Sequence, residues 1–464
     1  MNKEKILMLA IENHKKGNLE IAKKFYNDVL KIDPIHEQTY NNLGTIFQSL
    51  GKYAKAKSCF EKVIQINLNC IEAYFNLGNI YRILEKNQKA KNCFKKVIEL
   101  NPGYVGAYNN LGNIYRILEK NQKAKNCFKK VIELNSGYAG GYSNLGNIHK
   151  ILNELQESKS CFEKAIQINP SDVDAHFNLG NIFILLGENQ QAKKCFERVI
   201  EINSNYSPAY WNLYTLSDNI DEALIKLSKF DKVNNNFLPS KIMTSALKAY
   251  KGNFNNFNNL LASKDSNHSY TRSVKWVFSL PKLPKIFFNR WDFFDEIIKL
   301  AESSRPFYEF GVWNAVSFKY LIGTFKKGFG FDTFSGLPES WGNIKKGTYN
   351  SFGSIPKIKG GEFIVGKFED TLPEFFSKEK PLASLINFDA DLYSSTFCAL
   401  NHSRKVIDDK TILVFDEFIM NTNWEEDEYK ALNDFCKNFS FIYEVLAISF
   451  ASKQVAVKLK KLSS

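Results

Sequence analysis

The chain has 464 residues, of which 44% are hydrophobic, and it carries a formal net charge of +13. This length is too great for one hydrophobic core and predicts two or three domains, with the composition of a globular protein. No apolar run reaches 18 residues and the chain opens on a charged amphipathic helix, which disfavours a transmembrane segment and a signal peptide.

The excess of basic residues raises the question of nucleic-acid binding. The lysines are scattered over helix faces, and Asn and Ile are also abundant. A lysine-rich composition therefore explains the charge better, and no nucleic-acid partner is expected.

The first part of the chain repeats itself with a period of 34 residues, which is typical of paired-helix solenoids. Residues 76–101 and 110–135 carry the same sequence, NLGNIYRILEKNQKAKNCFKKVIELN. A Leu-Gly pair, an Ala and a Phe recur in register, which predicts a close approach of two helices at the Gly with the Phe between them. These residues resemble the tetratricopeptide repeat pattern from about Lys3 to Tyr206. Five cysteines also recur at one buried position of the repeats, so we expect free packing cysteines and a cytoplasmic protein.

An asparagine also recurs at the sixth position of each repeat, on the helix that lines the inside of such a superhelix. An amide can donate and accept, so a row of amides can hold a peptide backbone of any sequence. The row resembles the peptide-holding groove of O-linked N-acetylglucosamine transferases. The alternative is that recent copying of the repeats kept a solvated or helix-linking residue. The candidate peptide-binding or partner-binding residues are Asn42, Asn76, Asn110, Asn144 and Asn178.

After Asn212 the repeat pattern decays, and worn helical pairs are expected to cap the solenoid as far as about Lys264. Residues 265–290 are polar and contain prolines, which predicts a linker. The expected domains are therefore an all-α solenoid at 1–264 and a second domain at 291–464.

From Pro306 the pattern changes to short apolar strands separated by helices, the order of a doubly wound α/β sheet. Strands are expected at 307–310, 328–331, 362–365, 383–388 and 411–415, followed by a hairpin at 441–449 and 454–459. Acidic residues follow each of the first five strands. Ligands of such sheets bind beyond the carboxyl ends of the strands, so these acids are expected to form one site.

Five motifs, EFGVWNAVSFKYL, GFDTFSGLPESW, FIVGKFEDTLP, INFDADLYSST and VFDEF, resemble in order those of the macrocin O-methyltransferase family. The resemblance covers roughly Trp291 to Lys458. It implies a Rossmann-like class I fold and S-adenosylmethionine-dependent methylation of a sugar hydroxyl, assisted by magnesium or another divalent cation. Two departures are the sequence Asn314-Ala315-Val316, where the family usually has a second glycine-rich stretch, and Glu417, where it usually has Asp.

The resemblance also implies roles for individual residues. Asp389, Asp416 and Glu417 would hold the metal, and Asp391 would be the general base. The donor-binding residues would be Glu309, Gly311, Asp332, Glu369 and Asp370. A metal-bound hydroxyl loses its proton to a carboxylate more readily, which suits this chemistry.

Two functions remain open from the sequence. In the first, the chain is an O-methyltransferase for a carbohydrate-containing acceptor, and the repeats recruit the acceptor or a protein partner. In the second, it is a repeat adaptor whose C-terminal domain has kept the fold and lost turnover. The presence of all the acids favours the first function.

Overall fold

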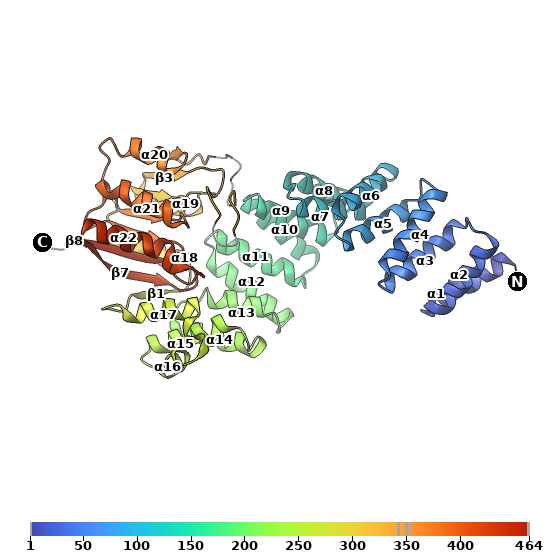
Figure 1. Cartoon of the computed structure of the whole chain (residues 1–464), viewed down its shortest axis with the longest axis horizontal. Coiled ribbons are helices and arrows are strands. Elements are labelled where there is room, and N and C mark those ends of the chain that lie inside the picture. Colours follow the sequence, from blue (N-terminus) through green and yellow to red (C-terminus); the bar gives the residue numbers. More distant parts are fainter. Residues whose placement is uncertain (1, 341–343, 349–350, 352, 354, 462–464) are drawn as a thin grey trace. The chain divides into compact units, whose positions relative to one another are not determined.

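The computed structural model describes residues 2–340, 344–348, 351, 353 and 355–461. The chain forms two compact units, residues 1–182 and 183–464, and the division falls within helix α11 (Val173–Leu185). Figure 1 labels the helices and strands of both units. No helix in the described ranges is long and apolar enough to cross a membrane.

The first unit consists of antiparallel helix pairs, one pair to each repeat (Figure 1). Its helices before α11 are α1 (Lys3–Lys15), α2 (Leu19–Ile32), α3 (Glu37–Ser49), α4 (Tyr53–Ile66), α5 (Ile71–Ile83), α6 (Asn87–Leu100), α7 (Val105–Ile117), α8 (Asn121–Leu134), α9 (Ala139–Ile151) and α10 (Leu155–Ile168).

The repeated glycine and phenylalanine hold each helix pair together, which confirms the interpretation of the sequence. A Cβ atom on Gly112 of α7 would lie 2.7 Å from Cε1 of Phe128 on α8. Gly44 and Gly78 stand in the same relation to the phenylalanines of their own pairs. Because the phenylalanine rings are fully buried, any side chain larger than hydrogen would force the two helices apart.

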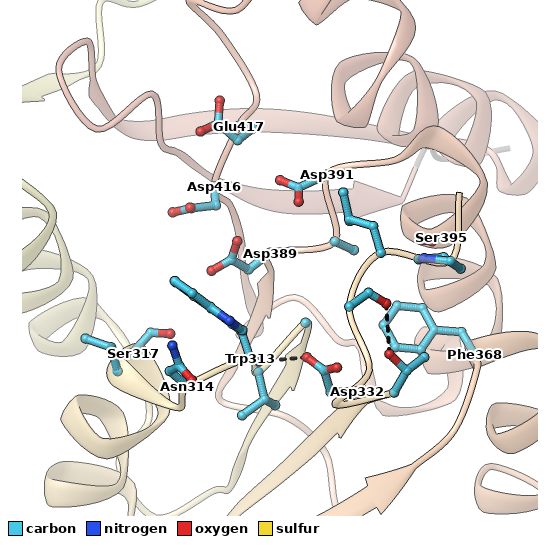
Figure 2. A pocket seen from close by; sticks show the side chains of 18 of the residues that line it. Trp313, Asn314, Ser317, Asp332, Phe368, Asp389, Asp391, Ser395, Asp416 and Glu417 are labelled. Atoms are coloured by element: carbon cyan, nitrogen blue, oxygen red, sulfur yellow. Dashed lines mark hydrogen bonds between the residues drawn. The ribbon is translucent and has the colours of Figure 1, made fainter. Parts of the chain in front are cut away.

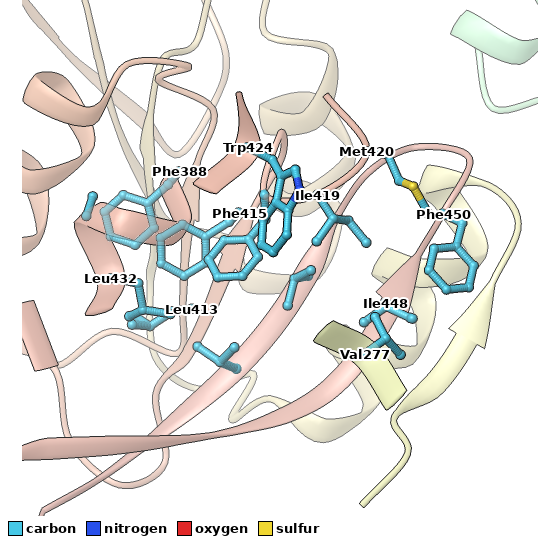
Figure 3. Close-up of a cluster of buried hydrophobic side chains, with 14 of the residues drawn as sticks. Val277, Phe388, Leu413, Phe415, Ile419, Met420, Trp424, Leu432, Ile448 and Phe450 are labelled. Carbon is cyan, nitrogen blue, oxygen red and sulfur yellow. The ribbon is translucent and has the colours of Figure 1, made fainter. Parts of the chain in front are cut away.

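The second unit begins with helices that continue the chain after α11. They are α12 (Asn189–Ile202), α13 (Ser207–Tyr214), α14 (Ile220–Val233), α15 (Leu238–Tyr250), α16 (Asn255–Leu261), the 3₁₀ helix η1 (Lys264–Asn267) and α17 (Ser269–Ser279). Apolar side chains of α13 to α17 share one core cluster with the sheet that follows (Figure 3). The rings of Tyr250 and Phe450, for example, lie 6.2 Å apart.

The predicted linker at 265–290 is therefore ordered structure. It contains α17 and strand β1 (Lys285–Phe287), which pairs in parallel with β7. Val274 and Val277 of α17 are fully buried, and the Ser273 hydroxyl accepts a hydrogen bond from the Met420 amide at 3.0 Å. Most residues of this segment are polar, which suggested a linker, but its apolar residues Val274 and Val277 lie on the buried face of α17.

The sheet has eight strands in the order β1-β7-β8-β6-β5-β2-β3-β4 and is mixed. Strands β2 to β6 run parallel to one another, and β8 is antiparallel to both β6 and β7. The bounds are β2 (Phe307–Phe310), β3 (Gly328–Asp332), β4 (Gly361–Val365), β5 (Leu385–Phe388), β6 (Ile412–Phe415), β7 (Phe441–Ser449) and β8 (Val455–Lys461). All seven strands expected from the sequence are present, and the closing hairpin is confirmed.

Helices cover both faces of this sheet. Successive residues of a strand point to opposite faces, so they enter two different cores. Phe307 of β2 packs with α18 (Arg290–Leu300) and α19 (Val316–Phe325), whereas Tyr308 enters the core of the opposite face. That second core also contains residues of the remaining helices. These are α20 (Phe368–Phe375), α21 (Tyr393–Ser403) and α22 (Glu428–Phe439), with the 3₁₀ helices η2 (Arg404–Val406) and η3 (Trp424–Glu426).

This shared core predicts where the chain can be shortened. A chain beginning at Ser266 lacks several fully buried side chains of the second unit, among them Leu227 and Leu247, each worth roughly 2 to 5 kcal/mol. It should lose cooperative unfolding, whereas a chain beginning at Val173 should retain it.

Tryptophan fluorescence measures this directly, because all six tryptophans occur at position 211 or later. The full chain is the control for the melting temperature. A cooperative transition at the full-chain temperature in the shorter protein would show that α12 to α16 are dispensable.

Candidate functional site

The candidate site lies where the order of the sheet reverses, between β2 and β5. From β2 the chain proceeds outward through β3 and β4, and β5 then starts the other half of the sheet. A cavity of about 300 Å³ opens beyond the carboxyl ends of these strands. This is the position at which doubly wound sheets bind their ligands.

Seven of the nine residues predicted for donor, metal and base roles line this one cavity. They are Gly311, Asp332, Glu369, Asp389, Asp391, Asp416 and Glu417. The cavity lining also includes Arg290, Trp313 and Phe368, which were not predicted from the sequence. Trp313 follows the predicted Gly311 by two positions, and Phe368 directly precedes the predicted Glu369. The nearby predicted residues could therefore have indicated these two aromatic residues.

Glu309 and Asp370 are not part of the lining. Glu309 points into the sheet, where Ser317 Oγ and Asn387 Nδ2 both donate to its Oε1 atom. Its other carboxylate oxygen has no partner within the described residues, and the side chain is fully buried. Asp370 lies exposed in the first turn of α20. Glu309 does not line the cavity, but Ser317, which donates to it, does.

Gly311 is required by the close approach of two strand ends. Its φ is +89°, and a Cβ atom at this position would lie 1.9 Å from the backbone oxygen of Asp389. The loop that follows is also held in an unusual conformation, since Trp313 and Ala315 both have left-handed φ angles. The departure from a glycine-rich stretch is thus accommodated by strained non-glycine residues.

Asp332 is fixed by the same loop. Its Oδ2 atom accepts a hydrogen bond from the Trp313 amide at 2.7 Å, and its Oδ1 atom accepts one from the Phe334 amide at 2.6 Å. Figure 2 shows the first of these bonds at the side of the cavity away from the other acids. The carboxylate is therefore held in place, with lone pairs left for a ligand.

Asp389, Asp391 and Asp416 gather on the opposite side of the cavity, with Glu417 beside them (Figure 2). Arg290, the first residue of α18, forms an ion pair with Asp416 through Nη2. Gln454 Nε2 donates to the other oxygen of Asp416 at 2.6 Å, and Lys453 Nζ donates to Glu417 at 2.7 Å. Asp416 and Glu417 thus already have charged and polar partners from the protein.

Burial dominates the electrostatics of this group. Loss of hydration raises the pKa of Asp389 well above its usual value, and the charge of Asp416 raises it further. Burial, followed by the charges of Glu417 and Asp416, raises the pKa of Asp391 to about 7. Asp391 also has a φ of 59°, a conformation that few non-glycine residues adopt.

The predicted metal ligands do not form a site for a divalent ion in this arrangement. Among the described residues, no three His, Cys, Asp or Glu side chains are grouped so that they could hold one. The cause is visible in the donor set. Both oxygens of Asp416 accept from protein donors and Glu417 is paired with Lys453, whereas magnesium requires several free oxygen ligands.

The start of α18, which carries Arg290, is held by the chain segment after residue 183. Asn289 caps α18 by accepting from the Trp291 and Asp292 amides, and Asn189 donates to the same Asn289 oxygen at 3.2 Å. Trp291 Nε1 donates to the backbone oxygen of Ile184 at 2.9 Å. Leu185 lines the cavity itself. The sequence does not indicate that residues 184–189 hold α18, because they lie about 100 positions before it.

The asparagine row of the first unit shows a helix-linking role. Asn110 Nδ2 donates to Oδ1 of Asn79 in the preceding repeat, and Asn144 Nδ2 donates to Asn109 in the same way, both at 2.9 Å. Two other members bond differently. Asn42 donates to the Tyr26 hydroxyl, and Asn178 donates to the backbone oxygen of Asp174 in its own helix. Asn76 occupies the equivalent position on α5 and is partly exposed. Peptide binding by these residues stays a prediction.

Burial raises the pKa of Glu309 to about 8, against an ordinary value of 4.5. The folded protein therefore retains a proton that the unfolded chain releases. The stability due to this proton is fully present below about pH 4.5 and is lost as the pH rises through about 8. In this window the free energy of unfolding should fall, relative to Glu309→Gln, by at most about 1.4 kcal/mol per pH unit.

Glu309→Gln is a suitable comparison because its amide oxygen still accepts from Ser317 and Asn387. Urea unfolding of both proteins at several pH values, monitored by tryptophan fluorescence, gives the change in the free energy of unfolding per pH unit for each. Parallel pH profiles for the two proteins would show that Glu309 is ionised in the fold.

A double-mutant cycle tests the link between repeats. Asn79→Ala and Asn110→Ala should each lower the free energy of unfolding by about 0.5 to 1.5 kcal/mol, because each removes the same amide hydrogen bond. The double variant should then lose little more than either single variant, as measured by urea unfolding and far-ultraviolet circular dichroism. Fully additive losses would mean that the two amides do not interact.

Several parts of the chain match known repeat families. Residues 37–70, 71–104, 105–138 and 173–206 match a family model described as tetratricopeptide repeat. A second model of that description matches residues 6–36, and one described as TPR repeat matches residues 146–187. No protein with a curated description matches the chain.

Solved structures with similar folds include the MamA protein, which is 25% identical, with 36% of this chain and 92% of MamA covered and a TM-score of 0.35. YrrB, described as a TPR protein with an unusual peptide-binding site, is 20% identical, with 40% and 95% covered and a TM-score of 0.36. A repeat protein from Parabacteroides merdae is 19% identical, with 53% and 98% covered and a TM-score of 0.41. On the family matches and the helix pairs, residues 6–206 are a tetratricopeptide repeat array.

Proposed function

We propose that the sheet of the second unit binds S-adenosylmethionine and that the protein methylates a hydroxyl group of a carbohydrate-containing acceptor. The observation that carries the proposal is the convergence of Gly311, Asp332, Asp389, Asp391 and Asp416 on one cavity at the switch point of the sheet. These residues come from the strand ends at which the sequence motifs resemble those of a methyltransferase family.

The cavity has features that suit such a donor. Gly311 lets the end of β2 pass close to the Asp389 backbone at the cavity wall, and Asp332, held by the Trp313 and Phe334 amides, has lone pairs left to accept hydrogen bonds from a ribose diol. The Phe368 ring supplies an apolar wall for an adenine ring. When bound, the donor supplies an electrophilic methyl group on a positively charged sulfur, and the nearby acids favour that charge.

Asp391 suits the role of general base. It is buried, lines the cavity and has a pKa raised to about 7, so a large fraction is ionised at neutral pH and can take a proton. A sugar hydroxyl is a much weaker acid, and removal of its proton as the oxygen reacts lowers the barrier. Carboxylate oxygens accept hydrogen bonds from hydroxyl groups, so the acids around Asp391 suit a polyhydroxyl acceptor.

The repeat array supplies a protein interaction module, since solenoids of this kind bind peptides or proteins on their concave surface. We propose that it recruits a protein partner or the carrier of the acceptor. The alternative is an adaptor whose sheet domain no longer turns over. The pairing of Asp416 with Arg290 and of Glu417 with Lys453 favours that alternative, because these acids then serve structure.

Binding of S-adenosylmethionine to the full chain by calorimetry, followed by transfer of a labelled methyl group to cell-surface glycan precursors, tests the proposal. Saturable binding with transfer supports the enzyme. Saturable binding without transfer to any hydroxyl acceptor supports the adaptor. Absence of binding would remove the proposed function of the sheet domain altogether.

Asp332→Ala should weaken binding of S-adenosylmethionine by about 1 to 3 kcal/mol, because charge-assisted hydrogen bonds to the ribose are lost. Asp370→Ala is the matched control, since this exposed acid is close in the fold to the same strand ends and does not line the cavity. Calorimetry on both variants gives the comparison. Equal affinities for wild type and Asp332→Ala would remove Asp332 from the donor site.

A further inference from the structure

The acidic cluster needs a positive charge, and the fold provides one. Asp389, Asp391 and Asp416 are crowded at the cavity wall, and Glu309 and Glu428 are fully buried behind it. Acidic groups brought together in a low-dielectric site need a counter-charge. A divalent cation would be one solution, but two of its three predicted ligands, Asp416 and Glu417, already accept from Arg290, Gln454 and Lys453.

Arg290 is placed to provide the counter-charge. It lines the cavity, pairs with Asp416, and also interacts electrostatically with the carboxyl groups of Asp389, Glu309 and Glu417. Lys453, the other cation of the group, pairs with Glu417 at the edge of the cluster and does not line the cavity. A guanidinium cannot be deprotonated in a protein, so its charge is permanent.

The backbone that carries Arg290 is also fixed. The residues on both sides of it are anchored, Asn289 by the cap of α18 and by Asn189, and Trp291 by the Ile184 carbonyl. Arg290 is therefore held between two anchored neighbours at the first position of a helix, with Asp416 126 residues away in the sequence. A surface arginine would have no such support.

We propose that Arg290 is the fixed positive charge of this acidic site, in the place of the divalent cation that the sequence resemblance implies. The inference rests on the proposed function for its catalytic meaning. A guanidinium at the cavity wall stabilises negative charge that develops on an acceptor oxygen. Chelators do not remove it, so methyl transfer should continue in excess chelator.

Metal binding to the full chain, without any methyl donor, tests this directly. The probe is Mn²⁺ alone, and its binding is measured by electron paramagnetic resonance. Wild type should show no saturable site at millimolar Mn²⁺, and Arg290→Lys, which keeps the charge, should behave alike. Arg290→Met keeps most of the length and removes the charge, so it should bind Mn²⁺ about tenfold or more tightly than wild type, because a positive charge a few ångström away is gone.

Two results would overturn the proposal. One is stoichiometric Mn²⁺ binding by wild type that Asp389→Asn abolishes. The other is a folded Arg290→Met variant, checked by its tryptophan fluorescence melt, that gains no affinity. If Arg290→Met does not fold, wild type and Arg290→Lys still decide, because saturable binding by either contradicts a permanent protein cation and its absence in both supports one.

The proposed function fails in a different way. Failure of S-adenosylmethionine to bind would remove the methyltransferase assignment, and the Mn²⁺ titrations would still report whether Arg290 or a metal balances the acids. Conversely, methyl transfer that stops in chelator and returns with magnesium would leave the enzyme assignment intact and contradict the role of Arg290.

Discussion

A row of stacked phenylalanine rings aligns the strand ends from which the site residues project. Phe331, Phe310, Phe388 and Phe415 are paired in register on four neighbouring parallel strands. The ring centroids of successive pairs are 4.7, 5.4 and 4.9 Å apart, with interplanar angles of 18° or less. The next residues in the chain are Asp332, Gly311, Asp389 and Asp416. Packing of the rings therefore brings these four residues to one edge of the sheet, because a slip of one residue would turn a ring to the other face.

The strands and the location of the site could be predicted because both depend on short-range patterns. Apolar runs define β2, β3, β5 and β6, an acid ends β3 or directly follows β5 and β6, and the ends of parallel strands must converge. The partners of the acids could not be predicted. The ion pair of Arg290 with Asp416 spans 126 positions, and nothing in the local sequence of either residue indicates the other. Glu309 illustrates the same limit, since only the packed sheet shows that its side chain points away from the cavity.

The repeat array was predictable for a different reason. Near-identical copies impose the same helix pair many times, so one interpretation of the Gly and Phe positions applies throughout. The asparagines show where this argument stops. A polar residue on the concave face can bond a ligand or a neighbouring repeat, and Asn110 and Asn144 do the latter. Each of these bonds uses one amide hydrogen, so the same side chains retain further hydrogen-bonding capacity for a peptide.

The charges at the cavity depend on residues of α11 and α12, the helices that contain Ile184 and Asn189. Burial and the charges of Glu417 and Asp416 raise the pKa of Asp391, and these two acids are paired with Lys453 and Arg290. Arg290 in turn depends on the start of α18, which Ile184 and Asn189 hold through Trp291 and Asn289. A displacement of residues 184–189 would therefore move the guanidinium and change the charge balance at Asp391. Through this chain of contacts, the first residues of the second unit are part of the site although they lie about 100 positions before Asn289 and Trp291 in the sequence.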